Sequence, residues 1–166
     1  MQITALFMSG QFYCLTAQHW RMIMNQIEKQ IDRIIAALKL NEGLKSVRFV
    51  REYGPHNIEN PISGLLAVVS VTDTSLSKSY IGGYLSSTIK GDSYAAKAEI
   101  RVYAPATENG SGLSEIVSEL LTGLKKADSQ KIIVESDASP IAFDPDLNAI
   151  YRTVHFEIEF CLCEEG

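Results

Sequence analysis

The residues best suited to chemistry lie near the end of the chain, at every second position of one stretch. They are His155, Glu157, Glu159, Cys161 and Cys163. In a β-strand, such residues share one face at a spacing of about 6.6 to 6.8 Å, so the five extend over about 27 Å. Only Cys161 with Cys163, or His155 with Glu157, could share a metal ion, and the chain has no second ligand cluster. We therefore predict no metal site here, and interpret this strand face as solvated or facing a partner.

A candidate nucleophile is Ser93, because the tripeptide Gly-Asp-Ser at residues 91–93 also introduces the nucleophile of some serine esterases. A serine nucleophile needs a histidine base within hydrogen-bond reach and usually an orienting carboxylate. His56 and His155 are the candidates, but neither lies in a recognisable companion motif. We interpret the tripeptide as a turn before the strand at Ala98. The hydrolase hypothesis predicts turnover of simple esters that disappears on Ser93→Ala.

Two glycine-containing segments, at residues 82–83 and 109–112, match neither nucleotide-binding glycine motif, so we predict no cofactor. Tyr80 and Tyr84 flank the first of them in a polar segment, and aromatic residues on such segments are favoured at protein interfaces. The alternative is that both tyrosines lie against their own sheet. Our candidate interface residues are Tyr80, Tyr84, Lys90, His155, Glu157 and Glu159.

Length and charge limit the classes of function. A chain of 166 residues is the size of one domain, and it buries about 70% of its unfolded surface on folding. The net charge is -5 and the basic residues are scattered, which argues against tight binding of free DNA or RNA. An acidic wall can still line a conduit for DNA, because it repels phosphate.

The three cysteines, Cys14, Cys161 and Cys163, are an odd number without a paired framework, which predicts free thiols in a reducing compartment. The start of the chain has no basic segment and no small-residue cleavage site, so we predict no signal peptide. No apolar run approaches the roughly 20 residues of a membrane-spanning helix. The prediction is a cytoplasmic protein that contacts no membrane.

Two segments have the apolar spacing of amphipathic helices. Residues 25–40 place Ile27, Ile31, Ile34, Ile35 and Leu38 on one face, with Gly43 as a stop signal, and residues 113–124 repeat the pattern after Ser111 as N-cap. All four methionines lie in the first 24 residues. Those residues are either an extension upstream of a natural start at Met22 or Met24, or a genuine segment with a strand and a first helical turn.

Strands are predicted at residues 45–52, 64–71, 98–103, 131–135 and 151–163, with a turn region at 139–148. The polar stretch 73–92 predicts a loop or a long exposed hairpin arm. The last strand alternates Val154, Phe156, Ile158, Phe160 and Leu162 with polar residues. We predict one α+β domain over residues 25–166, in which a mixed or antiparallel sheet carries both helices on its apolar face.

This order of elements resembles a known family. It has an N-terminal helix, a group of strands, a helix entered through a Gly-Ser turn, and a last strand Tyr-Arg-Thr-Val-His-Phe-Glu-Ile-Glu-Phe at residues 151–160. This order is similar to that of the tail-terminator and tail-completion proteins of long-tailed bacteriophages and prophages. The resemblance covers about residues 25 to 163 and is sharpest where Tyr151 and Arg152 enter the alternating strand. The first 24 residues depart from the family's compact pattern.

The resemblance implies a structural protein without catalysis, metal or cofactor, assembled in the bacterial host cytoplasm and found in the virion tail. It implies a ring, typically a hexamer, that ends growth of the tail tube, binds the tube protein, and joins a head-completion protein while DNA passes through. Such a ring needs a head-to-tail interface that closes by rotation. Assembly should be lost on deletion of the segment around Tyr80 and Tyr84. The alternatives are a small ligand- or peptide-binding module and a related head-tail connector subunit.

Overall fold

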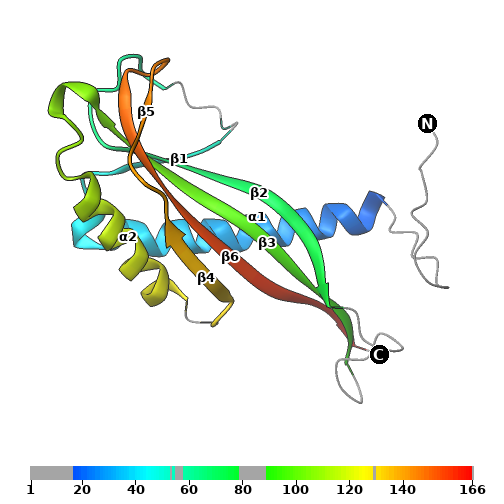
Figure 1. Ribbon diagram of the computed structural model, residues 1–166. Coiled ribbons are helices and arrows are strands. Elements are labelled where there is room, and N and C mark those ends of the chain that lie inside the picture. Colours follow the sequence, from blue (N-terminus) through cyan, green and yellow to red (C-terminus); the bar gives the residue numbers. More distant parts are fainter. Residues whose placement is uncertain (1–16, 53, 55–57, 79–88, 129, 166) are drawn as a thin grey trace.

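The computed structural model describes residues 17–52, 54, 58–78, 89–128 and 130–165. In chain order, its elements are α1 (Ala17–Lys39), η1 (Glu42–Leu44), β1 (Arg48–Arg51), β2 (Leu66–Lys78), β3 (Ile89–Pro105), η3 (Ala106–Glu108), α2 (Leu113–Ala127), β4 (Ile133–Ala138), β5 (Ala142–Asp144) and β6 (Ala149–Glu165). The strands form one mixed sheet in the order β1-β2-β3-β6-β4, and β5 also pairs with β6 (Figure 1). The predicted α+β fold is confirmed.

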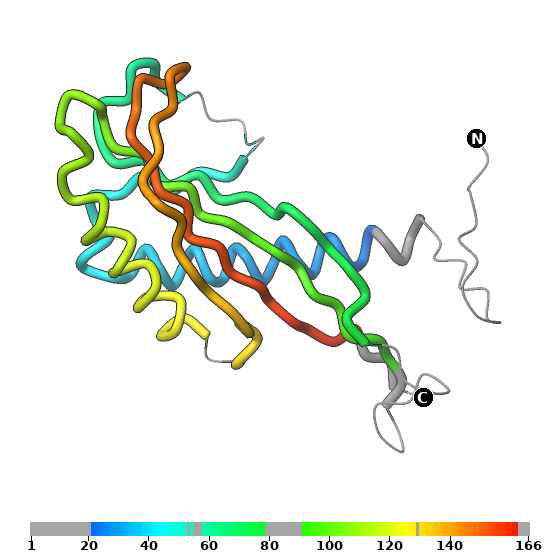
Figure 2. Tube along the Cα trace, in the orientation of Figure 1, coloured from blue at the N-terminus to red at the C-terminus, as the bar shows by residue number. Residues whose placement is uncertain are grey.

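The centre of the sheet is a long antiparallel pair. β3 and β6 pair without a register shift from Ile89 opposite Glu165 to Pro105 opposite Ala149. β2 pairs with β3 on the other side, with irregularities between Val71 and Asp73 and again near Lys78. Figure 2 shows β4 and β5 following one another along the outer edge of β6.

Three strands extend well past α2 and form an arm (Figure 1). β2 continues to Lys78 and β3 starts at Ile89, so the described parts of the polar stretch 73–92 are strand. The sequence predicted either a loop or a hairpin arm, and the strand conformation of these parts agrees with the arm. The sequence left both possibilities open because this stretch has few large aliphatic side chains.

Both helices pack on one face of the sheet, as predicted. Their apolar side chains meet alternate residues of β3 and β6, among them Ala98, Ile100, Val154, Phe156 and Ile158. α1 begins at Ala17, upstream of the predicted residue 25, and Ile23 is completely buried in this core. Residues 17–24 therefore continue the helix instead of forming a separate structure.

The two helices approach each other closely at Gly123 of α2. A Cβ atom at this position would lie 2.7 Å from Cδ2 of Leu38 on α1, so a hydrogen is the side chain that this contact best accommodates. The predicted N-cap of α2 is wrong. Gly112 occupies that position with φ of +79°, which suits glycine, and no side chain caps the helix, because Ser111 belongs to the preceding turn.

A smaller apolar cluster lies on the opposite face, at one end of the sheet. It contains Val50, Ile62, Leu66, Tyr103 and Ala149. The alternation of residues 98–103 places Tyr103 on the polar side of its strand, with Glu99 and Arg101, yet Tyr103 is 5% exposed because this cluster covers it. None of the helices in the described residues lies on this face. None of them is long and apolar enough to cross a membrane either.

Candidate interaction surface

The sheet face that points away from both helices, hereafter the open face, carries three of the sequence's candidate residues, His155, Glu157 and Glu159. Neighbouring strands place His155 of β6 between Glu99 of β3 and Asp137 of β4. The next row places Glu157 between Lys97 and Glu135. Strand register, which brings distant segments side by side, therefore assembles a charged surface from three strands.

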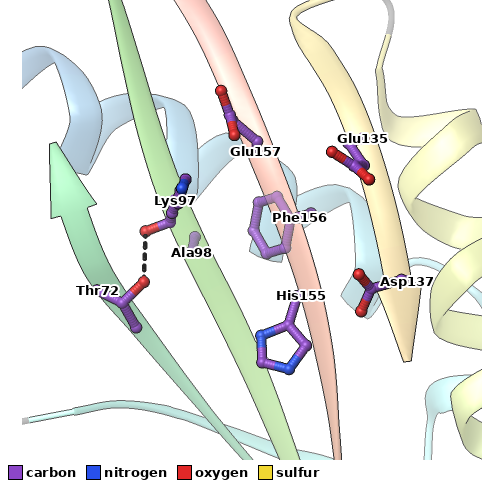
Figure 3. A pocket seen from close by; sticks show the side chains of 8 residues that line it. All are labelled: Thr72, Lys97, Ala98, Glu135, Asp137, His155, Phe156 and Glu157. Atoms are coloured by element: carbon purple, nitrogen blue, oxygen red, sulfur yellow. Dashed lines mark hydrogen bonds between the residues drawn. The ribbon is translucent and has the colours of Figure 1, made fainter. Parts of the chain in front are cut away.

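A shallow hollow of about 290 Å³ lies over these two rows. Figure 3 shows His155 and Glu157 on β6, with Glu135 and Asp137 beside them on β4 and Lys97 on β3. At its β2 side, the Thr72 hydroxyl donates a 3.3 Å hydrogen bond to the carbonyl of Lys97. The hollow is thus lined mainly by charged side chains.

His155 has a carboxylate neighbour but lies far from the candidate nucleophile. Its Nδ1 is 3.8 Å from a carboxylate oxygen of Glu99, and its side chain is 49% exposed. Ser93 pairs with Cys161, six residues further along β6, which corresponds to about 20 Å. His56 lies outside the described residues. The structure therefore does not bring His155 to Ser93.

Ser93 itself has a structural partner. It lies inside β3, so the prediction of a turn at residues 91–93 is wrong; these residues pair with the end of β6. The Ser93 hydroxyl donates a 3.0 Å hydrogen bond to Glu159, and the Ser77 hydroxyl donates one of 2.6 Å to the same oxygen. Lys78 approaches that oxygen to 3.6 Å. Glu159 thus ties together β2, β3 and β6 in the arm.

The two hydroxyls also change the acidity of Glu159. The hydrogen bonds from Ser77 and then Ser93 hold the pKa of this carboxyl below its ordinary value of 4.5. Burial opposes this shift, and the charge of Lys78 adds a lesser effect in the same direction as the hydroxyls. Because the folded-state pKa is the lower one, the resulting stability is fully present above the unfolded pKa. It is lost as the pH falls through the folded-state pKa.

We expect the variant Ser77→Ala/Ser93→Ala to depend less on pH in the acid range. The wild type should gain more free energy of unfolding than the variant between about pH 3 and pH 6, because the two hydroxyls that lower the pKa of Glu159 most are missing from the variant. Urea unfolding at a series of pH values measures this difference. The exposed neighbour Ser75 provides a control, since Ser75→Ala should retain the wild-type slope. Equal slopes in wild type and double variant would contradict the assignment.

At the other end of the open face, the charged side chains of Arg101 and Glu99 pair with each other. Arg101 donates to Glu99 at 2.8 Å and lies over the ring of Tyr151, 5.4 Å from its centroid. Burial is the main cause that raises the pKa of the nearby Tyr103 phenol. Glu99 and Arg101 therefore largely neutralise each other, whereas the carboxylates around the hollow have no such partner among the described residues.

The predicted interface residues are only partly brought together. His155 and Glu157 share the hollow, and Glu159 lies one row further along the arm. Lys90 lies in β3 opposite Glu164, but its side chain is outside the described set, as are Tyr80 and Tyr84 entirely. Sequence reasoning missed Lys97, Glu99, Glu135 and Asp137. The alternation within each strand could have placed them on a polar face, but not beside His155.

The expectation of three free thiols is wrong, because Cys161 is disulfide-bonded. An odd number of cysteines without a framework still permits a single pair. The side chains of the other two cysteines, Cys14 and Cys163, lie outside the described residues. Within the described part of the chain, no three His, Cys, Asp or Glu side chains are grouped so as to hold a metal ion.

No protein-family model matches the chain, and no curated protein matches it. The assignment of a function therefore depends on the fold and on the open face.

Proposed function

We propose that this chain is a structural subunit of a bacteriophage or prophage tail, which caps the tail tube as a ring and joins it to the head. The observation that carries the proposal is the asymmetry of the sheet. Two helices cover one face, while most of the other face remains free of any described helix and continues into a three-stranded arm. Such a subunit has an extended surface for neighbours, and the hollow on the described part of this surface is shallow.

The roles of the reactive residues support a structural interpretation. The Ser93 hydroxyl is hydrogen-bonded to Glu159, and Ser93 lies far from His155. Among the described residues, Ser93 therefore has no histidine base within hydrogen-bond reach. The same interactions hold the strands of the arm in register. We therefore propose a protein that works by assembly and does not catalyse a reaction.

Charge is compatible with a channel for DNA. The chain carries a net charge of -5, so a wall built from several copies is negative overall. A negative wall repels phosphate and keeps the polymer from sticking. In the proposed role, DNA slides past the subunit without specific contacts.

The hollow gives less support to the alternative, a small ligand- or peptide-binding module. Ligand sites commonly occupy about 300 to 1,000 Å³ and are mainly apolar. The hollow of about 290 Å³ is at the lower limit of size and is lined chiefly by charged residues. A head-tail connector subunit with a related fold would present the same surfaces, and its binding partner would distinguish it.

Purified tail tubes without a terminator provide the test. We expect the protein to bind at tube ends, seen by negative-stain electron microscopy, and to stop further polymerisation when tube subunits are added. Binding to head-completion particles but not to tubes would instead identify a connector. Binding to neither, by protein that is folded and active in self-association, would overturn the proposal.

A further inference from the structure

We propose that the open face of one copy docks on the outer surface of α1 and α2 of the next copy. The inference rests on the ring in the proposed function and names the two surfaces that form it. It is a heterologous contact, in which two different surfaces of the same chain meet. Charge complementarity between these surfaces carries the inference.

The open face is negative around the hollow. Glu135, Asp137 and Glu157 form no ion pair with any described residue, and Lys97 is the one lysine among the residues that line the hollow. His155 adds a positive charge only when protonated. Further along the arm, Glu159 is matched by Lys78. The carboxylates around the hollow therefore leave an excess of negative charge for a partner to neutralise.

The outer surface of the helices is positive. On α1, the acidic residues Glu28 and Asp32 are already matched by Arg51, whose guanidinium lies 2.6 Å from Glu28 and 3.8 Å from Asp32. On α2, the acidic residues are Glu115 and Glu119, and Glu119 accepts a hydrogen bond from the side chain of Asn41. The remaining exposed charges are mostly basic, and none of these basic side chains has an ion pair within the described residues: Arg21, Lys29, Lys39, Lys125 and Lys126. The helix surface thus carries the positive charge that would neutralise the negative open face.

The helix surface also has a groove and exposed apolar side chains that a partner could contact. A groove of about 280 Å³ lies between α1 and the end of α2, lined by Arg33 and by the small side chains of Ala36 and Ala37. Met22 and Met24 are 49% and 41% exposed on α1. Exposed methionines adapt readily to a partner surface.

Charge favours a head-to-tail contact over a symmetric one. Two open faces would place carboxylates against carboxylates, and like charges brought together at an interface weaken association. An open face against a helix surface pairs opposite charges. An open chain of copies then retains one unused surface of each kind, one at either end, so addition continues, and the chain closes as a ring where the rotation between copies brings its ends together.

A charge exchange tests the inference. The sheet variant is Glu135→Lys/Glu157→Lys, and the helix variant is Lys29→Glu/Arg33→Glu. Each variant alone presents two surfaces of the same sign, so its self-association should weaken at least about tenfold. Mixed in equal amounts, each variant's altered surface meets the complementary surface of the other. The mixture should therefore recover the wild-type mass, with the two variants in a one-to-one ratio by native mass spectrometry.

A matched control reverses two acidic charges elsewhere. Glu108→Lys/Asp146→Lys changes net charge as much as the sheet variant does, but lies in the turns at the end of the sheet where Pro105 pairs with Ala149, six to eight residues along the strands from the hollow, and should assemble as the wild type does. Circular dichroism and thermal melting establish that every variant is folded. Wild-type assembly by either surface variant alone, or a mixture that stays monomeric, would overturn the inference.

The failure of the inference and that of the proposed function are distinguishable. A wild type that is strictly monomeric in solution overturns the direct contact between copies. Tube-end binding then still decides whether the chain is a tail protein.

Discussion

Phe156→Ala should lower the free energy of unfolding by about 3 to 5 kcal/mol. The Phe156 side chain is 3% exposed and packs in the main core beneath the helices. Its removal leaves a cavity that the surrounding strands and helices fill only in part, so the loss of burial and the cavity both contribute. Urea unfolding followed by circular dichroism measures the change.

The adjacent residue is the matched control. Glu157 lies on the same strand but points to the open face, where it has no ion pair with a described residue. Glu157→Ala should change stability by no more than about 0.5 kcal/mol. Comparable losses in the two variants would contradict the assignment of faces in β6, on which the open face depends.

Ile23→Ala should have the next largest effect, a loss of about 2 to 5 kcal/mol. Ile23 is completely buried, although it precedes the periodic segment predicted for the helix. Met24 is 41% exposed on the same turn, so Met24→Ala provides the control and should cost far less. If both substitutions were equally harmless, the first turns of α1 would not pack on the sheet.

Periodic segments of the sequence predicted most of the fold. Residues 25–40 and 113–124 each have the apolar face of one helix, and the alternation from Val154 to Leu162 is that of one strand; all three pack on the core. What failed depended on contacts beyond the element. Tyr103 is buried by the distant Val50 and Ile62, and a strand pattern alone does not reveal a cluster on its second face.

The open face could be predicted only in part for the same reason. The spacing of His155, Glu157 and Glu159 places them on one face of a strand, and the structure does so. Their neighbours from β3 and β4 are set by strand order and register, which follow from tertiary pairing. Ser93 shows a different error: a motif of three residues suggested a turn, whereas pairing with the distant β6 makes this segment a strand.

The central claim, that the protein works by assembling into a ring, is tested most directly by its mass in solution. Light scattering over a wide range of concentration, with negative-stain images of the concentrated sample, gives the number of subunits and the form of the assembly. The account predicts closed rings, typically of six copies, that form as concentration rises. A strict monomer that also fails to form rings on tail tubes would contradict it.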